Sequence, residues 1–540
     1  MIYRNPFILF FLFLTIFISQ SVAQNMPRVP GDKPKLIVIA VIDQMRFDYM
    51  YRFSDQFTND GFKKLTNEGT VFKNATHNYL LTQSIPGYVT IMSGAEPANH
   101  GVVSDQWISR VNNQMIKAGL DPKVEAIDAK GDNLNFSPRH LRTSFFTDEL
   151  NLSNQSRSKI YSIALDGDVA AMAGGHSADG VFWFDHASGK WITSTFYRDS
   201  LPSWVRKFNE KKLADIYLDR KWMPLEPEKE VADTGKFTIK GFMHDLINIK
   251  KLTNNYRVIK RTPFGNTLTK DFAIASIVND SLGYDNYTDV LVVGFNAPGH
   301  INQKHGPMSD EIADTYHRLD RDIAHFLSFL DAEIGKEKVL FLLTADRGTG
   351  YAPDYLEANG VPSGEFDHKQ MIAVLKSYLN VVYGKGEWIQ NYSAKQIYLN
   401  HQLVEDAKVD LYEMQERIAR FVVQFSGISD AMPASIMQKS SFVSGTNYLM
   451  QNSYHRQRSG DVIINLEPGW IEKTDKKVLQ NSGYNYDVHV PLIWYGWKMP
   501  RLTIYRDVKT SDIAVKLSEF LEIAPPNGST GDVIQELLGR

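Results

Sequence analysis

Ser84 has the surroundings expected of a hydroxyl nucleophile, because it lies in the turn-forming segment TQSIPG at residues 82–87. Upstream, the apolar run Leu36–Ile42 ends in a carboxylate, Asp43. If the run is a strand and the segment around Ser84 is a loop, the carboxylate and the hydroxyl could meet at one metal ion. Such a pair would suit phosphate-ester chemistry.

The elements that must position these groups can be predicted from the hydrophobic pattern. Three short apolar runs end in or just before polar residues: Leu36–Ile42 before Asp43, Val290–Phe295 before Asn296, and Val339–Thr344 shortly before Asp346. Their length and their β-branched content favour strands. A helical pattern at Ser309–Glu333 indicates βα units, so we expect an α/β fold with a doubly wound, mainly parallel sheet. Ligands bind outside the carboxyl ends of the strands in such sheets.

Further short motifs occur in a fixed order along the chain. They are VIDQMR at 41–46, the Ser84 segment, GHSA at 175–178, FWFD at 182–185, Gly299-His300, Thr344-Ala345-Asp346 and YNYDVHVPL at 484–492. This series resembles the alkaline phosphatase superfamily, specifically its secreted bacterial alkaline phosphatases and their type I phosphodiesterase and nucleotide pyrophosphatase relatives. The resemblance implies an alkaline-phosphatase-like fold, but the function must be argued from the site itself.

The resemblance also implies a site with two zinc ions about 4 Å apart. The metal that activates the nucleophile would be held by Asp43, Asp346 and the residue that follows Asp346, with Ser84 as the alkoxide. The metal that receives the leaving group would be held at the positions of Asn296, His300 and His489.

Two of the implied ligand positions carry the wrong residue type. Arg347 stands where the family has histidine, and a guanidinium cannot deprotonate to bind a metal. Asn296 stands where the family has aspartate, which exchanges an anionic ligand for a neutral amide. We therefore expect fewer than two zinc ions, and we expect Arg347 to replace one of them as the counter-charge of Asp43 and Asp346.

The substrate side departs from the family as well. At the positions where the most similar phosphatases use asparagine, lysine and arginine to contact phosphate, this chain has Asp105, Asp166 and Asp168. Carboxylates repel a phosphate dianion by several kcal/mol, since unit charges 4 Å apart interact by about 4 kcal/mol at an effective dielectric constant near 20. The sequence thus favours loss of the standard activity.

Each of these residues also has an ordinary structural interpretation. The strand-end carboxylates could cap helices or pair with Arg347, and Ser84 could simply begin a turn. His300 and His489 could be structural histidines or a remnant two-histidine metal site. The three substituted carboxylates could be solvated loop residues or could line a pocket for a cation or an amine.

Composition narrows the class of protein. The net charge of −3 and the absence of a long basic run give no reason to expect nucleic-acid binding. The first residues predict a signal peptide over 1–23: Arg4 supplies a positive charge, residues 7–18 form an apolar stretch, and Ser21-Val22-Ala23 form a cleavage site. The alternative is a membrane anchor that is not cleaved. We expect a periplasmic or secreted protein without a stable membrane span, and the absence of cysteine excludes disulfides and thiolate metal sites.

Residues 24–540 are expected to form one alkaline-phosphatase-like domain with cap-type insertions near 191–263 and 384–464. Three functions remain open for a small-molecule ligand or ester substrate. The first is an active metal-dependent phosphatase or phosphodiesterase that uses Ser84 and could work with one metal. The second, which the substitutions favour, is a pseudo-phosphatase that keeps the fold and a binding pocket. The third is a hydrolase retuned to a cationic or neutral substrate. The sequence does not determine the oligomeric state.

Overall fold

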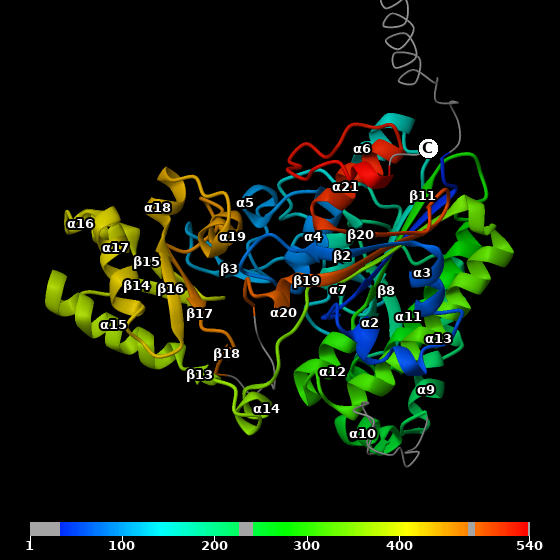
Figure 1. Ribbon diagram of the computed structural model, residues 1–540, viewed down its shortest axis with the longest axis horizontal. Helices are drawn as coiled ribbons and strands as arrows, with labels where there is room; N and C mark the ends of the chain where they lie inside the picture. The colour runs from blue at the N-terminus through cyan, green and yellow to red at the C-terminus, as the bar shows by residue number, and fades with distance from the viewer. Residues whose placement is uncertain (1–32, 226–240, 474–480, 538–540) are drawn as a thin grey trace, which may run out of the picture. The chain divides into compact units, whose positions relative to one another are not determined.

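A computed structural model describes residues 33–225, 241–473 and 481–537 of the chain (Figure 1). The signal peptide expected at 1–23 lies outside the described residues. Among the described residues, no helix combines the length and the apolar composition that crossing a bilayer requires.

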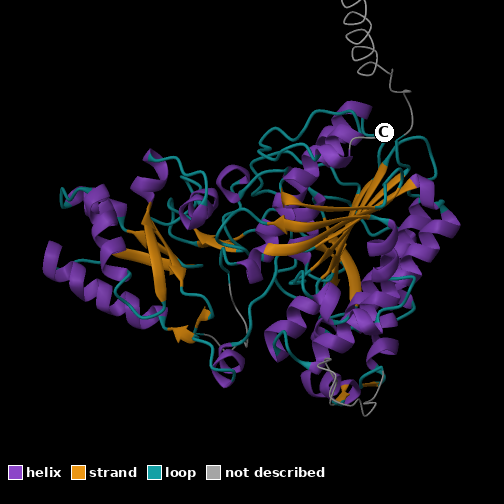
Figure 2. Ribbon diagram, viewed as in Figure 1, coloured by secondary structure: helices purple, strands orange, loops and turns teal. Residues whose placement is uncertain are grey.

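The centre of the fold is a ten-stranded sheet, drawn as the large twisted group of orange strands in Figure 2. Its order is β20 (Leu502–Lys509), β2 (Thr70–Thr76), β19 (His489–Gly496), β12 (Val339–Thr344), β1 (Leu36–Ile42), β11 (Asp289–Phe295), β6 (Ile160–Ala164), β7 (Gly180–Asp185), β8 (Lys190–Ser194) and β5 (Ala126–Ile127). The strands β12, β1, β11, β6 and β7 run parallel to one another. Strand β19 is antiparallel to β12 and β2, and β8 is antiparallel to β7 and β5. The predicted doubly wound, mainly parallel α/β fold is confirmed.

Helices cover both faces of this sheet because β1 is apolar on both sides. All seven of its residues are buried, which is typical of a central parallel strand. Alternate β1 side chains pack with α11 (Phe264–Asp280) and α13 (Asp310–Glu333) on one face. The others pack with α4 (Ser84–Ser93), α7 (Gly167–Gly174) and α21 (Asp512–Phe520) on the other.

The three predicted strands and the long predicted helix are present with nearly the expected bounds. The helix α13 begins directly after Ser309, whose side chain accepts a hydrogen bond from the Ile312 N–H as an N-cap. Shorter elements connect the layers: α2 (Tyr49–Arg52), η1 (Ser54–Gln56), α3 (Phe62–Glu68), α5 (Pro97–His100), β3 (Gln106–Ile108), β4 (Met115–Lys117), α6 (Phe146–Asn154), α12 (Ala297–His305), η3 (Lys336–Lys338), α14 (Pro353–Ala358), α20 (Asn485–Val488) and η4 (Gln535–Leu537).

The segment expected as the first insertion, 191–263, starts within β8 and then forms mainly helices. It contains α8 (Ser203–Glu210), α9 (Leu213–Leu218), the two-stranded β9 (Lys221–Trp222) and β10 (His244–Asp245), α10 (Leu246–Thr253) and η2 (Arg257–Arg261). Many of its apolar side chains join the core that α11 and α13 form on the sheet. This segment therefore contributes to the main core.

The segment expected as the second insertion, 384–464, belongs to a unit with its own hydrophobic core. Its four-stranded sheet has the order β14 (Ile389–Ser393), β15 (Gln396–Leu399), β17 (Val462–Leu466) and β16 (Ile428–Pro433). The helices are α15 (His368–Tyr383), α16 (His401–Asp406), α17 (Leu411–Val422), α18 (Ala434–Lys439) and α19 (Gly445–Ser453), and β13 (Gly364–Phe366) pairs with β18 (Trp470–Glu472). Because α15 contributes Met371, Leu375 and Leu379 to that core, the unit begins before residue 384.

Candidate active site

Four polar residues meet beyond the carboxyl ends of neighbouring parallel strands. Asp43 follows β1, Asn296 follows β11, Asp346 lies just after β12, and Asp166 lies just after β6. The strand order β12-β1-β11-β6 makes these strands direct neighbours. The sequence prediction that the strand ends form one site is therefore consistent with the register of the sheet.

Asn296 links two of these strand ends through hydrogen bonds. Its side-chain Nδ2 donates to Asp43 Oδ2 at 3.0 Å, and its Oδ1 accepts from the Asp166 N–H at 3.2 Å. Asn296 is fully buried, so the orientation of its amide is set by these two partners. The amide thus presents an N–H donor, rather than an oxygen ligand, to the Asp43 carboxylate.

Asp43 is buried and receives a second hydrogen bond from Tyr88, whose hydroxyl donates to Asp43 Oδ1 at 2.9 Å. Burial raises the pKa of Asp43 well above its ordinary value, and the charge of Asp346 raises it further. The hydrogen bonds from Asn296 and Tyr88 oppose this rise. Sequence reasoning missed Tyr88, because no motif connects an aromatic residue inside α4 with the end of β1.

Asp346 is fully buried, and its Oδ1 accepts the backbone N–H of Gln44 at 2.7 Å. Gln44 has a positive φ of 58°, the left-handed conformation that turns this N–H toward the carboxylate. Burial raises the pKa of Asp346, while the Arg347 charge and a hydrogen bond from Ser84 lower it, with a net upward shift. Among the described residues, the Oδ2 of Asp346 has no hydrogen-bond partner.

Arg347 is only 4% exposed and lies within a group of carboxylates. Its positive charge lowers the pKa values of Asp346, Asp487 and Asp105, although burial keeps the net shift of each upward. Asp487 is itself bound by Ser482, which donates through its N–H at 2.9 Å and its hydroxyl at 2.6 Å. The guanidinium therefore acts as a fixed counter-charge at the position where the family resemblance implies a zinc ligand.

The sequence pattern predicted a loop around Ser84. In the structure, Ser84 is instead the first residue of the helix α4. Pro86 is tolerated there because the first turn of a helix needs no N–H donor from it. Gly87 lets α4 approach β12 closely: a Cβ at this position would lie 2.1 Å from the carbonyl oxygen of Asp346. This close packing of backbones places the Ser84 hydroxyl beside the Asp346 carboxylate.

Asp166 is neutralised by two partners. Its Oδ1 accepts from Lys260 Nζ at 2.7 Å, and its Oδ2 accepts from His300 Nε2 at 2.7 Å. Burial alone would raise the pKa of Asp166, but His300 and Lys260 outweigh it and hold the pKa well below its ordinary range. Lys260 comes from η2 and had no sequence signal. Its charge corrects the expectation that Asp166 simply adds negative charge to the pocket.

Asp105 and Asp168 lie near the same group. Asp105 Oδ1 accepts the N–H of Ile85 in the first turn of α4 at 3.0 Å, and Asp168 is the second residue of α7. Burial raises the pKa of Asp105 to about 7, and the Asp168 charge adds to the rise. Burial and the charge of Asp166 likewise raise the pKa of Asp168. Both side chains are partly buried, and Asp105 itself lies in a bend between α5 and β3.

Replacing Asp105 by asparagine is expected to stabilise the protein in a pH-dependent way. The folded protein holds the Asp105 proton more tightly than the unfolded chain, so this group's contribution to stability is present below the unfolded pKa of 3.8 and is lost as the pH rises through about 7. Asp105→Asn removes that loss and still accepts the Ile85 N–H. Urea unfolding should show a gain in the free energy of unfolding of about 1–3 kcal/mol at pH 8.5 and a clearly smaller gain at pH 4.5, where only the first part of the loss has occurred. An equal difference at both pH values would contradict this.

His489 begins β19 and has other partners. Its Nε2 donates to the backbone carbonyl of Lys73 at 2.7 Å, and its ring stacks on Phe47 with the ring centroids 4.3 Å apart. The Nε2 atom of His489 is therefore hydrogen-bonded to the main chain of β2. His300 is likewise engaged by Asp166, so the proposed remnant two-histidine metal site would require both rings to exchange their partners.

The residues present fit the two-zinc group of the family poorly. At the leaving-group position, the Asn296 N–H faces Asp43 and the His300 nitrogen faces Asp166. At the nucleophile position, Arg347 supplies a cation where a ligand is needed. Of the implied ligand positions, only Asp43 and Asp346 still offer carboxylate oxygens suited to a metal, and the Oδ2 of Asp346 has no hydrogen-bond partner among the described residues.

Comparisons with known proteins agree with the fold. The family model for type I phosphodiesterase / nucleotide pyrophosphatase matches residues 36–487. The chain is 34% identical to a protein named calcium-transporting ATPase from Myroides odoratus, with 94% of this chain and 95% of that protein covered. It is 31% identical to alkaline phosphatase PafA from Elizabethkingia meningoseptica, with 96% of each chain covered. The crystal structure of wild-type PafA superposes with a TM-score of 0.88 and 29% identity, covering 95% of this chain and 100% of PafA.

Proposed function

This chain belongs to the type I phosphodiesterase and nucleotide pyrophosphatase family of the alkaline phosphatase superfamily, and from that premise we propose that it is a pseudo-phosphatase. It keeps the phosphate-ester hydrolase fold, and we place its small ligand at the strand ends, beside Asp43 and Asp166. Protein charges replace the two zinc ions that the resemblance implies. We further propose that the chain is exported to the periplasm or secreted, in keeping with the leader pattern at 1–23.

The observation that carries this proposal is the orientation of the buried Asn296 amide. Its N–H donates to Asp43 while its oxygen is used by the Asp166 backbone. A metal between Asp43 and Asn296 would face the amide N–H, which is the positive end of the amide dipole. If the amide rotated by half a turn to offer its oxygen to the metal, that oxygen would lie against the Asp43 carboxylate. Both polar ends of the Asn296 amide are thus already paired with protein groups.

The charges around the site support the same conclusion. Lys260 and His300 both contact the Asp166 carboxylate. The charge of Arg347 stabilises the ionised forms of Asp346 and Asp487. Because these cations already have carboxylate partners, a phosphate dianion would have to compete with the protein's own anions for them. We therefore infer that the pocket favours a neutral or cationic small molecule over a phosphate monoester.

The experiment that tests this function compares the wild-type protein with Ser84→Ala in p-nitrophenyl phosphate and bis-p-nitrophenyl phosphate assays containing zinc. Equal and near-background rates are expected for both proteins with both substrates. Thermal unfolding of the two proteins serves as a control that the variant is folded. Turnover that requires Ser84 would refute the pseudo-phosphatase proposal.

One observation favours a second candidate, a hydrolase that uses a single metal. The Ser84 hydroxyl lies beside Asp346, and Asp346 Oδ2 is buried without a hydrogen-bond partner among the described residues. A metal held by Asp43 and Asp346 would satisfy this oxygen and lower the pKa of the Ser84 hydroxyl. Under this candidate the same assay would give zinc-dependent turnover that Ser84→Ala abolishes.

A further inference from the structure

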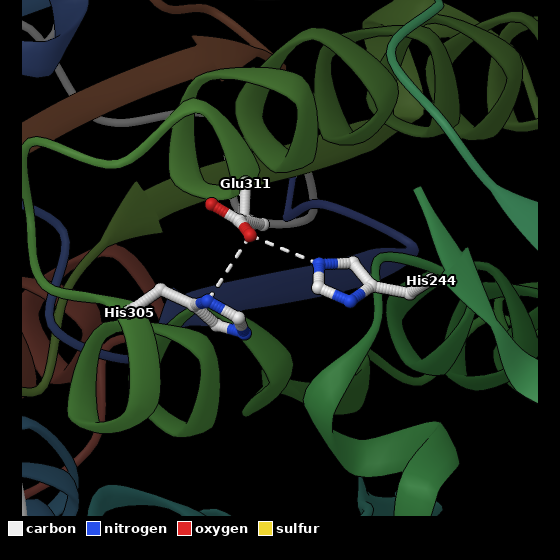
Figure 3. Close-up of side chains that lie close together, drawn as sticks. All are labelled: His244, His305 and Glu311. Atoms are coloured by element: carbon white, nitrogen blue, oxygen red, sulfur yellow. Dashed lines mark hydrogen bonds and ion pairs between the residues drawn. The ribbon is translucent and has the colours of Figure 1, made fainter. Parts of the chain in front are cut away.

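Two histidines and a glutamate converge outside the candidate active site, as Figure 3 shows. His244 lies in β10, His305 is the last residue of α12, and Glu311 lies in the first turn of α13. His244 Nε2 is 2.9 Å from Glu311 Oε1, and His305 Nδ1 is 3.1 Å from the same oxygen. Three separate segments of the chain thus meet at one carboxylate.

The spacing of these three atoms is close to that of a metal site. The two nitrogens and the carboxylate oxygen lie within 4.8 Å of one another. In a tetrahedral zinc site with bonds of about 2.0–2.2 Å, neighbouring ligand atoms are about 3.3 Å apart. The observed separations of 2.9 and 3.1 Å therefore need to widen by only a few tenths of an ångström, which small side-chain rotations provide.

Hydrogen bonding alone accounts for the cluster incompletely. Both imidazoles share one oxygen of Glu311, and the second ring nitrogen of His305, Nε2, is buried and has no hydrogen-bond partner among the described residues. Burying His305 is therefore costly, because one of its ring nitrogens shares its acceptor oxygen with His244 and the other has no hydrogen-bond partner. Coordination of one metal by His305 Nδ1, His244 Nε2 and Glu311 Oε1 would replace the two hydrogen bonds that now share a single oxygen.

The surroundings also suit a metal. The rings of Trp222 and Phe242 pack around His244, with ring centroids 5.2 and 5.3 Å from its own. This apolar shell limits access of water to one side of the cluster, a common property of metal sites. Glu311 supplies a carboxylate oxygen, the anionic ligand among the three.

We propose that His244, His305 and Glu311 form a binding site for zinc or a similar divalent transition metal, separate from the Asp43 site. Two imidazoles and one carboxylate match the ligand preference of zinc. The three side chains are partly exposed, at 23%, 15% and 13%, which leaves room for water as the fourth ligand. The metal joins β10 to the facing ends of α12 and α13, and so connects residues 241–263 to the helix that carries His300.

The test begins with wild-type protein stripped of metal by EDTA and then titrated with zinc by calorimetry. We expect one zinc ion to bind per chain and the melting temperature to rise. Failure of the stripped wild-type protein to bind zinc would overturn the proposal without the use of any variant. Cobalt substitution adds a spectroscopic readout, since a tetrahedral site gives strong visible absorption.

Two sets of variants assign the bound ion. Glu311→Gln and His305→Ala should each weaken zinc binding by about tenfold or more, whereas the Asp43→Asn, Asp346→Asn double variant should leave it unchanged. Unchanged affinity in both cluster variants would mean an adventitious ion only and would overturn the site. Loss of binding in the double variant would instead place the zinc at the strand ends, which would contradict the proposed function.

Discussion

Replacing Arg347 by methionine is expected to destabilise the protein by about 3–5 kcal/mol at pH 8, the cost of leaving buried charges without their partner. Arg347 is 4% exposed, and its charge lowers the pKa values of Asp346, Asp487 and Asp105. Methionine fills a similar volume but carries no charge, so the carboxylates must either ionise unpaired or take up protons. Urea unfolding in EDTA measures the loss without interference from zinc.

The pH dependence of this loss distinguishes charge from packing. The folded pKa values of these carboxyl groups lie above the unfolded value of 3.8 and rise further without Arg347. The difference in unfolding free energy between the wild type and Arg347→Met should therefore be largest above the raised pKa values. It should shrink as the pH falls and the carboxyl groups of both folded proteins take up protons. Arg347→Lys, the matched control, should retain part of the stability. A loss that is the same at pH 8 and pH 4.5 would show that Arg347 acts by packing alone.

Restoring the ligands and cations that the resemblance implies should restore zinc binding and phosphatase activity. The variant combines Asn296→Asp, Arg347→His, Asp166→Lys and Asp168→Arg with Lys260→Gln, which removes the like charge that would otherwise face the new lysine. These changes supply two metal ligands, release His300 from Asp166 and restore two cations for phosphate. We expect turnover of p-nitrophenyl phosphate to rise by about a hundredfold or more, the scale that one oriented electrostatic contact contributes.

Adding Ser84→Ala to this variant provides its control. If Ser84 is the inherited nucleophile position, the alanine should remove the gain in turnover while zinc binding remains. Zinc content by metal analysis and the rate with p-nitrophenyl phosphate are the two readouts. If neither zinc binding nor turnover increases, the assignment of residues to site positions is wrong.

The strands at the centre of the fold could be predicted because they are buried on both faces. A parallel strand in that position is a short, continuous apolar run, and Leu36–Ile42 and Val339–Thr344 have the predicted bounds. The polar residues just beyond these runs, Asp43 and Asp346, were therefore visible as candidates for the strand-end site. The helix α13 was visible because its apolar residues repeat with the helical period.

The partners of the site residues could not be predicted, because only tertiary folding brings them there. Lys260 lies in a short helix of the segment that was expected to be a cap, and no local pattern connects it with Asp166. Tyr88 reaches Asp43 from one side of α4, in which every residue after Ser84 is buried. The substitutions at Asn296 and Arg347 were readable from the sequence, but the direction of the Asn296 amide depends on the backbone of Asp166.

Anomalous diffraction at the zinc absorption edge, from crystals of the wild-type protein soaked in zinc, tests most directly whether protein charges have replaced the metals. We expect no zinc peak among Asp43, Asn296 and Asp346, and we expect the Asn296 amide to stay hydrogen-bonded to Asp43. A zinc ion bound between Asp43 and Asp346, with Arg347 displaced from them, would contradict it.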